Sequence, residues 1–170
     1  MAAPNVSSVR VRSRRPRGSA LVEFSLAVLP LLAFFLGIVD VSFAVFIKNT
    51  LLFAVRQGVR YAVTSQTMTG MGQDASIKTT VITYSAGLVN TLSSDHNGMN
   101  HVTVTYYDPT TLNVVTGANS NIGGNIVVVS VSGMTWNWMA PIWHGSTPLT
   151  FAVASADVME ASPIAGPPAR

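Results

Sequence analysis

The sequence contains no cysteine, which excludes a disulfide framework and any Cys-x-x-Cys redox or zinc motif. It also lacks the Gly-x-Ser-x-Gly nucleophile motif and a glycine-rich nucleotide-binding loop. The three histidines, His96, His101 and His144, do not have the spacing of metal ligands. We therefore predict that the protein is not an enzyme and that it needs no metal and no cofactor.

Oxygen-bearing side chains gather at one place in the chain, around Gly98. Asp95, Asn97 and Asn100 could contribute ligands to a calcium ion, because calcium binds carboxylate and amide oxygens. The third oxygen ligand before the glycine and the distal acid of a calcium loop are missing, however. We interpret residues 93–100 as a turn rich in Asn and Asp.

Charge is nearly absent from one long apolar run. From Leu26 to Ile47 the chain has 22 residues, of which only Asp40 carries a charge. As a helix rising about 1.5 Å per residue, this run would be about 33 Å long, close to the ~30 Å hydrocarbon core of a bilayer. The sequence therefore predicts a single transmembrane span. Asp40 lies about 25 Å along the helix from Glu23, and we expect it to snorkel to the outer interface; a subunit contact is the alternative.

The charges on the two sides of this run are unequal. Lys48 follows it directly, whereas five arginines and no acid precede it. Positively charged flanks remain in the cytoplasm, so we expect the N-terminus inside and the residues after about 48 outside. Loss of residues 1–18 would remove five basic residues and no acid, changing the net charge from +3 to −2, so we predict no nucleic-acid partner. The five are Arg10, Arg12, Arg14, Arg15 and Arg17.

Two other kinds of export signal fit this N-terminus poorly. A cleaved secretory signal has an apolar core of about 7–15 residues, shorter than this one, and the possible cut site at 42–44 still lies inside the run. A twin-arginine signal would use the pair at 14–15, but Pro16 follows it and an acid, Glu23, stands in the next stretch. Neither signal explains Gly18, five residues before that acid.

Gly18 is followed by the segment Ser-Ala-Leu-Val-Glu-Phe and then by the apolar run. This order resembles the processing site of type IV prepilins. The basic leader, with Glu23 and Phe24 fifth and sixth after the glycine, further resembles the pseudopilins of tight-adherence (Tad/Flp) systems, in particular the TadE-like minor pilins. The stretch LTFAVASADVME at 149–160 also fits this family, whereas residues 60–150 match it only loosely.

The resemblance implies that a membrane-embedded aspartyl prepilin peptidase cuts after Gly18 on the cytoplasmic side and leaves Ser19 as the new N-terminus. Glycine has no Cβ to hinder a peptidase that binds an extended backbone, and the arginines hold the site at the anionic leaflet. The resemblance also implies that the Glu23 carboxylate pairs with the freed amine of a neighbouring subunit during assembly. The less specific alternative is that Glu23 lies at headgroup level on a simple membrane anchor.

Two hypotheses of function follow. In the first, the protein is a processed minor pilin that takes part in assembly of a tight-adherence pilus, and so in adhesion, surface attachment and biofilm formation. Its partners would be the peptidase, other pilin subunits and the inner-membrane assembly platform. In the second, it stays in the bacterial inner membrane as an envelope scaffold with an uncut leader. A mature chain of 152 residues is larger than the small major pilins of these systems, which favours a minor subunit.

The apolar pattern after the span predicts two helices. Leu51, Val55 and Val59 recur at helical spacing, so the first helix should continue to about residue 65, with its second half against the exported domain. A glycine-containing break then precedes a second amphipathic helix at 75–92, with Asp74 at its start.

Period-two alternation of β-branched and aromatic residues then predicts three or four antiparallel strands, which gives an α+β fold. The expected strands are 101–107, 112–115, 125–133 and 151–159. The expected organisation is a leader at 1–18, a transmembrane and stalk helix at 19–66, an exported domain at 67–160 and a flexible tail at 161–170.

Trp136, Trp138 and Trp143 lie within eight residues of one another, in a loop before the last expected strand. An indole ring is apolar and carries one N–H donor, so such a loop could contact a membrane interface or fill a partner's groove. It could equally fold back over the sheet as core or lid. The sequence leaves these alternatives open.

Overall fold

The computed structural model describes residues 17–140, 145, 147–163 and 166–170. Within these residues, four helices precede four strands that form one antiparallel sheet. The expected α+β fold, with a long N-terminal helix and a small domain, is confirmed. Several residues singled out in the sequence lie outside the described residues, namely Arg10, Arg12, Arg14, Arg15 and Trp143.

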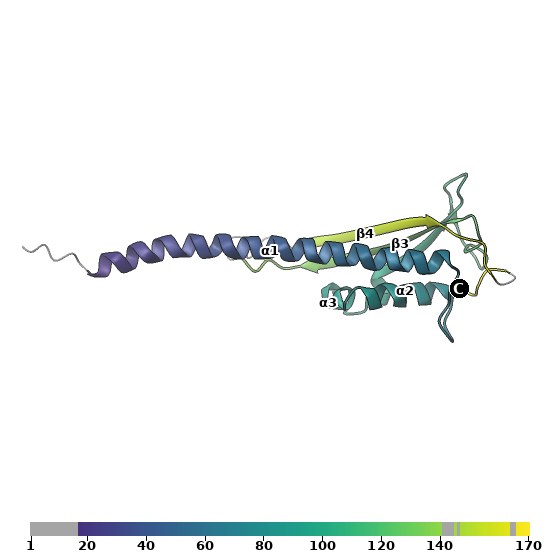
Figure 1. The fold of residues 1–170 in the computed structure, drawn as a ribbon, viewed down its shortest axis with the longest axis horizontal. Coiled ribbons are helices and arrows are strands. Elements are labelled where there is room, and N and C mark those ends of the chain that lie inside the picture. The colour runs from purple at the N-terminus through teal and green to yellow at the C-terminus, as the bar shows by residue number, and fades with distance from the viewer. Residues whose placement is uncertain (1–16, 141–144, 146, 164–165) are drawn as a thin grey trace, which may run out of the picture.

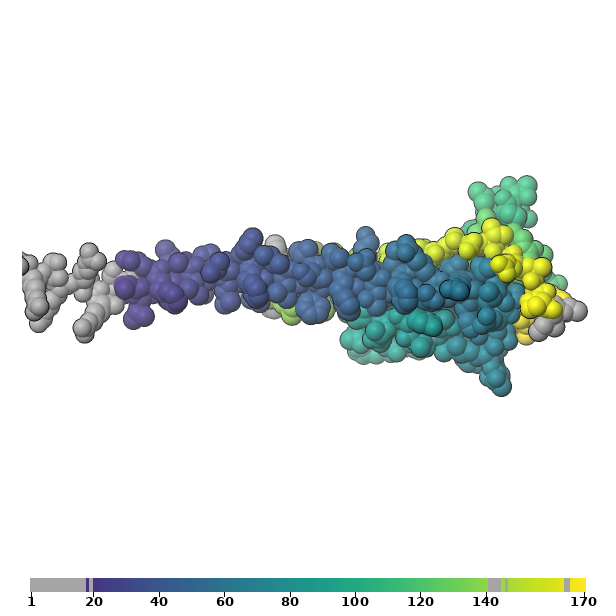
Figure 2. Space-filling view, in the orientation of Figure 1, coloured from purple at the N-terminus to yellow at the C-terminus, as the bar shows by residue number. Residues whose placement is uncertain are grey.

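Helix α1 spans Arg17–Val63 and continues through Pro30. Its 47 residues correspond to about 70 Å of helix. Of the side chains described before Gly37, none is buried, and this N-terminal part projects from the domain in Figures 1 and 2. Further along, one stripe of α1 faces the domain, because residues four apart lie on the same side of a helix. Its buried members include Ile47, Leu51, Val55 and Val59.

The second helix is shorter than the pattern predicted. Helix α2 spans Gln73–Tyr84 and α3 spans Leu88–Leu92, in place of one helix over 75–92. Ala86 and Gly87 separate them with positive φ angles of 51° and 79°. A left-handed residue of this kind ends an α-helix, and glycine adopts it without a steric penalty.

The four strands pair antiparallel, with β1 between β2 and β3 and with β4 beside β3. They are β1 (Val102–Tyr107), β2 (Val114–Val115), β3 (Ile126–Trp136) and β4 (Leu149–Val158), and a short helix α4 (Gly98–His101) leads into β1. The order across the sheet is β2-β1-β3-β4. The β3–β4 hairpin lies along α1 and extends farther toward the N-terminal part of that helix than α2 and α3 do (Figure 1).

Two contacts show which end of the hairpin lies at which end of α1. Its open end lies at the end of α1, where the backbone N–H of Glu160 donates to the carbonyl oxygen of Val63 at 3.2 Å. We call this the distal end of the domain. At the other end, the ring of Trp136 stacks on that of Phe43. The ends of β3 and β4 at their turn therefore lie beside the apolar run of α1.

Strand β3 does not end at Gly133, as the sequence suggested, but continues to Trp136. The register with β4 shifts between Val131 and Met134, which marks a β-bulge. Gly133 adopts φ +78° there, and an added Cβ would lie 2.8 Å from the Nδ1 of His101. Glycine therefore permits the bulge, and the bulge lets the strand carry Trp136 to α1.

The core lies between one face of the sheet and helices α1 and α2. Alternate residues of β3, Val127, Val129 and Val131, are buried on that face. The two helices lie close together at Gly58, where an added Cβ would overlap the side chain of Val81 in α2. Val81 is fully buried and has no room to yield. Glycine at 58 thus sets the distance between α1 and α2.

We expect Gly58→Ala to destabilise the domain. Alanine gains up to about 1 kcal/mol of helix propensity, but forcing a methyl group into a packed core costs about 1–3 kcal/mol. The net loss should appear as a lower midpoint of urea unfolding of the full chain in detergent micelles. Gly18→Ala is the matched control, because a Cβ at Gly18 meets nothing within 4 Å. A Gly58→Ala protein as stable as the parent would contradict the tight contact.

Candidate functional site

The segment that resembles a processing site forms the first turns of α1. Gly18, Glu23 and Phe24 are all exposed. An ideal Cβ built on Gly18 would meet nothing within 4 Å, so the fold itself does not require glycine at this position. Glycine there is consistent with recognition by another molecule.

The exposed surface of the first half of α1 is apolar. Among the described residues, one helix is long and apolar enough to cross a membrane, and it lies near the N-terminus. This fits a single-pass membrane anchor. Large side chains that are more than half exposed on it are Leu21, Val22, Phe24, Leu26, Leu29, Leu31, Leu32, Phe34, Phe35 and Ile38.

The expectation that Asp40 snorkels to the outer interface is wrong. Its side chain is fully buried, and both carboxyl oxygens accept the backbone N–H of Met139 at 3.0 Å. Its Oδ2 also accepts the N–H of Ala140 at 2.7 Å. Because these donors come from the chain after β3, Asp40 ties that segment to α1. No local pattern indicates a bond between residues so far apart in sequence.

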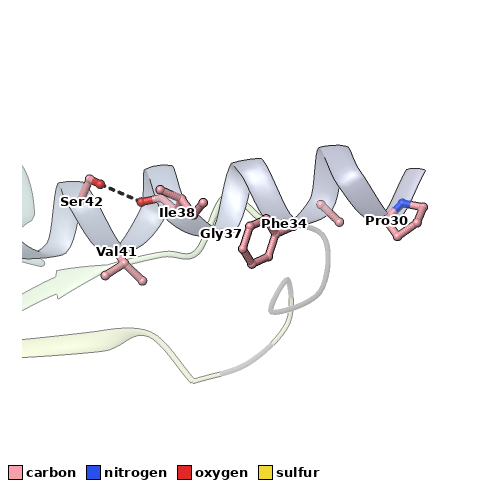
Figure 3. A pocket seen from close by; sticks show the side chains of 7 residues that line it. Pro30, Phe34, Gly37, Ile38, Val41 and Ser42 are labelled. Atoms are coloured by element: carbon pink, nitrogen blue, oxygen red, sulfur yellow. Dashed lines mark hydrogen bonds between the residues drawn. The ribbon is translucent and has the colours of Figure 1, made fainter. Parts of the chain in front are cut away.

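An apolar groove of about 630 Å³ lies along the side of α1 near this tie. Figure 3 shows the side chains of Pro30, Phe34 and Val41 along it. The hydroxyl of Ser42 is occupied within the helix, donating to the carbonyl oxygen of Ile38 at 2.8 Å. The described lining thus offers no converging polar groups of the kind that bind a substrate.

The two described tryptophans of the loop lie against α1. Trp136 is half-buried and stacks on Phe43, with ring centroids 5.7 Å apart and an angle of 14° between the planes. Trp138 is also half-buried, and its Nε1 donates to the carbonyl oxygen of Thr147 at 3.2 Å. Trp138 and Lys48 line a shallow groove between α1 and β4. The described residues of the loop therefore do fold back: Trp136 packs against Phe43 of α1 and the hydrophobic core, and Trp138 lies beside α1.

The residues around Gly98 form a hydrogen-bonded turn. Asp95 accepts the Asn100 side chain at 2.8 Å, the Asn97 backbone N–H at 3.0 Å and the His101 Nε2 at 2.9 Å. These bonds, above all the one from Asn100, hold the pKa of the Asp95 carboxyl well below its usual range. Within the described residues, no three His, Asp or Glu side chains are placed to hold a metal ion.

A second polar cluster lies at the distal end. Asp74, expected at the start of α2, accepts the Tyr106 hydroxyl at 2.8 Å and the Arg170 Nη2 at 2.6 Å. Burial raises the pKa of Tyr106 well above its usual range, and the neighbouring Asp74 adds to this. The carbonyl oxygen of Ala169 accepts the backbone N–H of Gln73 at 2.7 Å, so the last residues of the tail contact the domain. We interpret this cluster as structural.

A protein-family model matches the N-terminal part of the chain. The family model described as TadE-like protein matches residues 18–60, which covers the glycine, the acid and the first part of α1 that faces the domain. Comparisons with curated proteins and with solved structures give no match. The matched segment contains Gly18, Glu23, Phe24, Asp40 and Lys48.

Proposed function

We propose that this chain, whose residues 18–60 match the family of TadE-like proteins, is a minor pilin, or pseudopilin, of a tight-adherence pilus. The observation that carries this proposal is the exposed apolar half of α1, headed by Gly18 and Glu23. A helix of this kind is stable in a bilayer or against neighbouring apolar helices, and not in water. A pilin encounters both environments, the bilayer and the neighbouring helices.

The first step of the proposed function is processing. A prepilin peptidase in the inner membrane cuts after Gly18, removes the arginine-rich leader and leaves the amine of Ser19 as the new N-terminus. The positive charge of the leader keeps this end at the cytoplasmic surface, and the domain at the far end of α1 lies outside. The exposure of Gly18 and the empty space around it support access by the peptidase.

The second step is assembly. In the mature protein Glu23 lies four residues after the new N-terminus, near the inner end of the apolar helix. Its carboxylate pairs with the Ser19 amine of a neighbouring subunit as the helices pack. Such a pair removes the cost of two separate charges in an apolar environment and fixes the axial register between subunits.

The test is the N-terminal sequence of the protein recovered from membranes and from sheared surface material. We expect a start at Ser19 in both fractions. A start at Met1 or Ala2, with protein only in the membrane, would contradict the proposal and favour an uncut envelope scaffold. A start at Ser19 confined to the membrane would support processing and contradict incorporation into the pilus.

We expect Glu23→Ala and Glu23→Gln to be processed normally but to assemble poorly. Hydrogen bonds to charged groups contribute about 1.5–3 kcal/mol, so losing one per subunit should reduce surface pili about tenfold or more. Counting pili by electron microscopy measures this, and immunoblotting of the membrane fraction checks processing. If Glu23→Gln assembles like the parent while Glu23→Ala does not, the carboxylate charge is not what matters.

A further inference from the structure

The level of the β3–β4 turn relative to the membrane follows from the length of α1. Phe43 lies 20 residues after Glu23, which is about 30 Å along a helix, the thickness of the hydrocarbon core. With Glu23 at the inner boundary, Phe43 lies at the outer boundary. Trp136 stacks on Phe43, and Met139 bonds to Asp40, about 4–5 Å along α1 toward the bilayer centre, so the described residues of the turn and the strand ends beside it, 136–140 and 147–149, lie close to this boundary. We call these residues the hairpin tip.

The hairpin tip is chemically suited to a lipid surface. From Ile126 to Ala156 the sequence has no Asp, Glu, Lys or Arg. Met139 is 48% exposed and Trp138 is half-buried, and both lie next to the apolar surface of α1. The carboxyl group of Asp40 is buried and accepts backbone N–H groups, so it presents no charge to lipid. Asp95 lies near the tip, since its neighbours Ser94 and His96 line a pocket with Trp136, and its carboxylate accepts from Asn97, Asn100 and His101.

Lys48 supplies a cation that matches the phosphate groups of the lipid. It is exposed, and it lines the same groove as Trp138. It lies five residues beyond Phe43, about 7–8 Å farther from the hydrocarbon core, which is the depth of the phosphate groups. Aromatic rings at the boundary with a lysine just outside are the usual composition of a membrane interface.

We propose that the hairpin tip is a second membrane contact of this protein. Trp138 and Met139 lie in the outer interface of the bilayer that α1 crosses, Trp136 supports them against Phe43, and Lys48 binds lipid phosphate. The proposal rests on the membrane anchoring of α1, but not on cleavage or pilus assembly. A lipid surface fits better than a second copy of the chain because the tip continues the membrane-spanning surface and Lys48 matches anionic headgroups.

Tryptophan emission reports on the surroundings of this surface, because the three tryptophans of the chain are at 136, 138 and 143. The full chain carrying Trp136→Phe and Trp143→Phe keeps only Trp138. It is reconstituted in vesicles of phosphatidylcholine and phosphatidylglycerol that contain brominated phospholipid. We expect bromine near the headgroups to quench about half of the Trp138 emission, and bromine near the bilayer centre to quench much less.

The matched control places the fluorophore at the distal end. In a chain with all three tryptophans changed to Phe, Tyr107→Trp should give emission that no brominated lipid quenches. Lys48→Glu should reduce the quenching of Trp138 in these anionic vesicles. Arg56→Glu should not, because position 56 is about 12 Å farther along α1, beyond a Debye length of about 10 Å.

Flotation with the vesicles separates the possible failures. Protein that floats but whose Trp138 is not quenched would overturn the lipid contact and leave the membrane anchor intact. An unquenched emission that shifts with the ratio of protein to lipid would assign the surface to a second copy instead. Protein that does not float would overturn the anchor, and this proposal with it. None of these outcomes depends on whether the leader is cut.

Discussion

Gly18→Leu should leave the protein in the membrane at the size of the uncut precursor. A peptidase that binds an extended backbone has to approach it closely, and a leucine side chain at the cut prevents this approach. The fold gives no competing explanation, because a Cβ at Gly18 meets nothing within 4 Å. Immunoblotting for the loss of the leader, followed by N-terminal sequencing, measures the effect, which we expect to be near complete.

Ala20→Leu is the matched control for this substitution. It adds the same side chain to an exposed position two residues away, beyond the bond that is cut. We expect its maturation to be close to that of the parent. If Gly18→Leu also loses its leader and begins at Ser19, the assignment of the cut site is wrong. If both variants accumulate uncut, the bulk of the side chain disturbs insertion and not recognition.

Asp40→Ala should destabilise the domain by about 2–4 kcal/mol, because it leaves two backbone N–H donors, those of Met139 and Ala140, without an acceptor. The N–H of Ala140 is the costlier of the two to leave unsatisfied, since the residue is fully buried. Urea unfolding of the full chain in detergent micelles, followed by tryptophan emission, measures the loss. Asp40→Asn should lose less, since one amide oxygen still accepts.

Ser42→Ala provides the control for Asp40. The Ser42 hydroxyl is exposed and bonds only within α1, so its removal should change stability little. Equal stabilities for Asp40→Ala and Ser42→Ala would show that the bonds to Met139 and Ala140 contribute nothing. The same Asp40→Ala protein should also lose the stacking of Trp136 on Phe43, which near-ultraviolet circular dichroism detects.

The parts of the fold that the sequence predicted are those that follow a local repeat. Apolar residues four apart in α1 and alternating residues in β3 predicted the helix and the strand, and these residues are buried in the structure. The left-handed residues at Ala86 and Gly87 and the bulge at Gly133 were missed. A glycine in a sequence signals that such a conformation is permitted, and only the surrounding packing decides whether it is used.

The position of Asp40 could not be predicted at all. An acid in an apolar helix is compatible with an interface, a subunit contact or a buried bond, and the sequence does not distinguish these. The deciding partners are backbone N–H groups about a hundred residues away, which every non-proline residue carries and no pattern marks. The segment from Gly18 to Phe24 could be proposed from the sequence alone, because a processing site would be a short contiguous stretch; its role stays a prediction.

The tie between Asp40 and the hairpin tip has a mechanical consequence. A domain joined to its membrane helix through one segment alone could rotate freely at the membrane surface. Here α1 passes into the domain without a break, and a second attachment joins the two at the same level, so bending there is opposed on two sides. A force applied to the distal end is therefore transmitted along α1 and acts on the domain and the helix together.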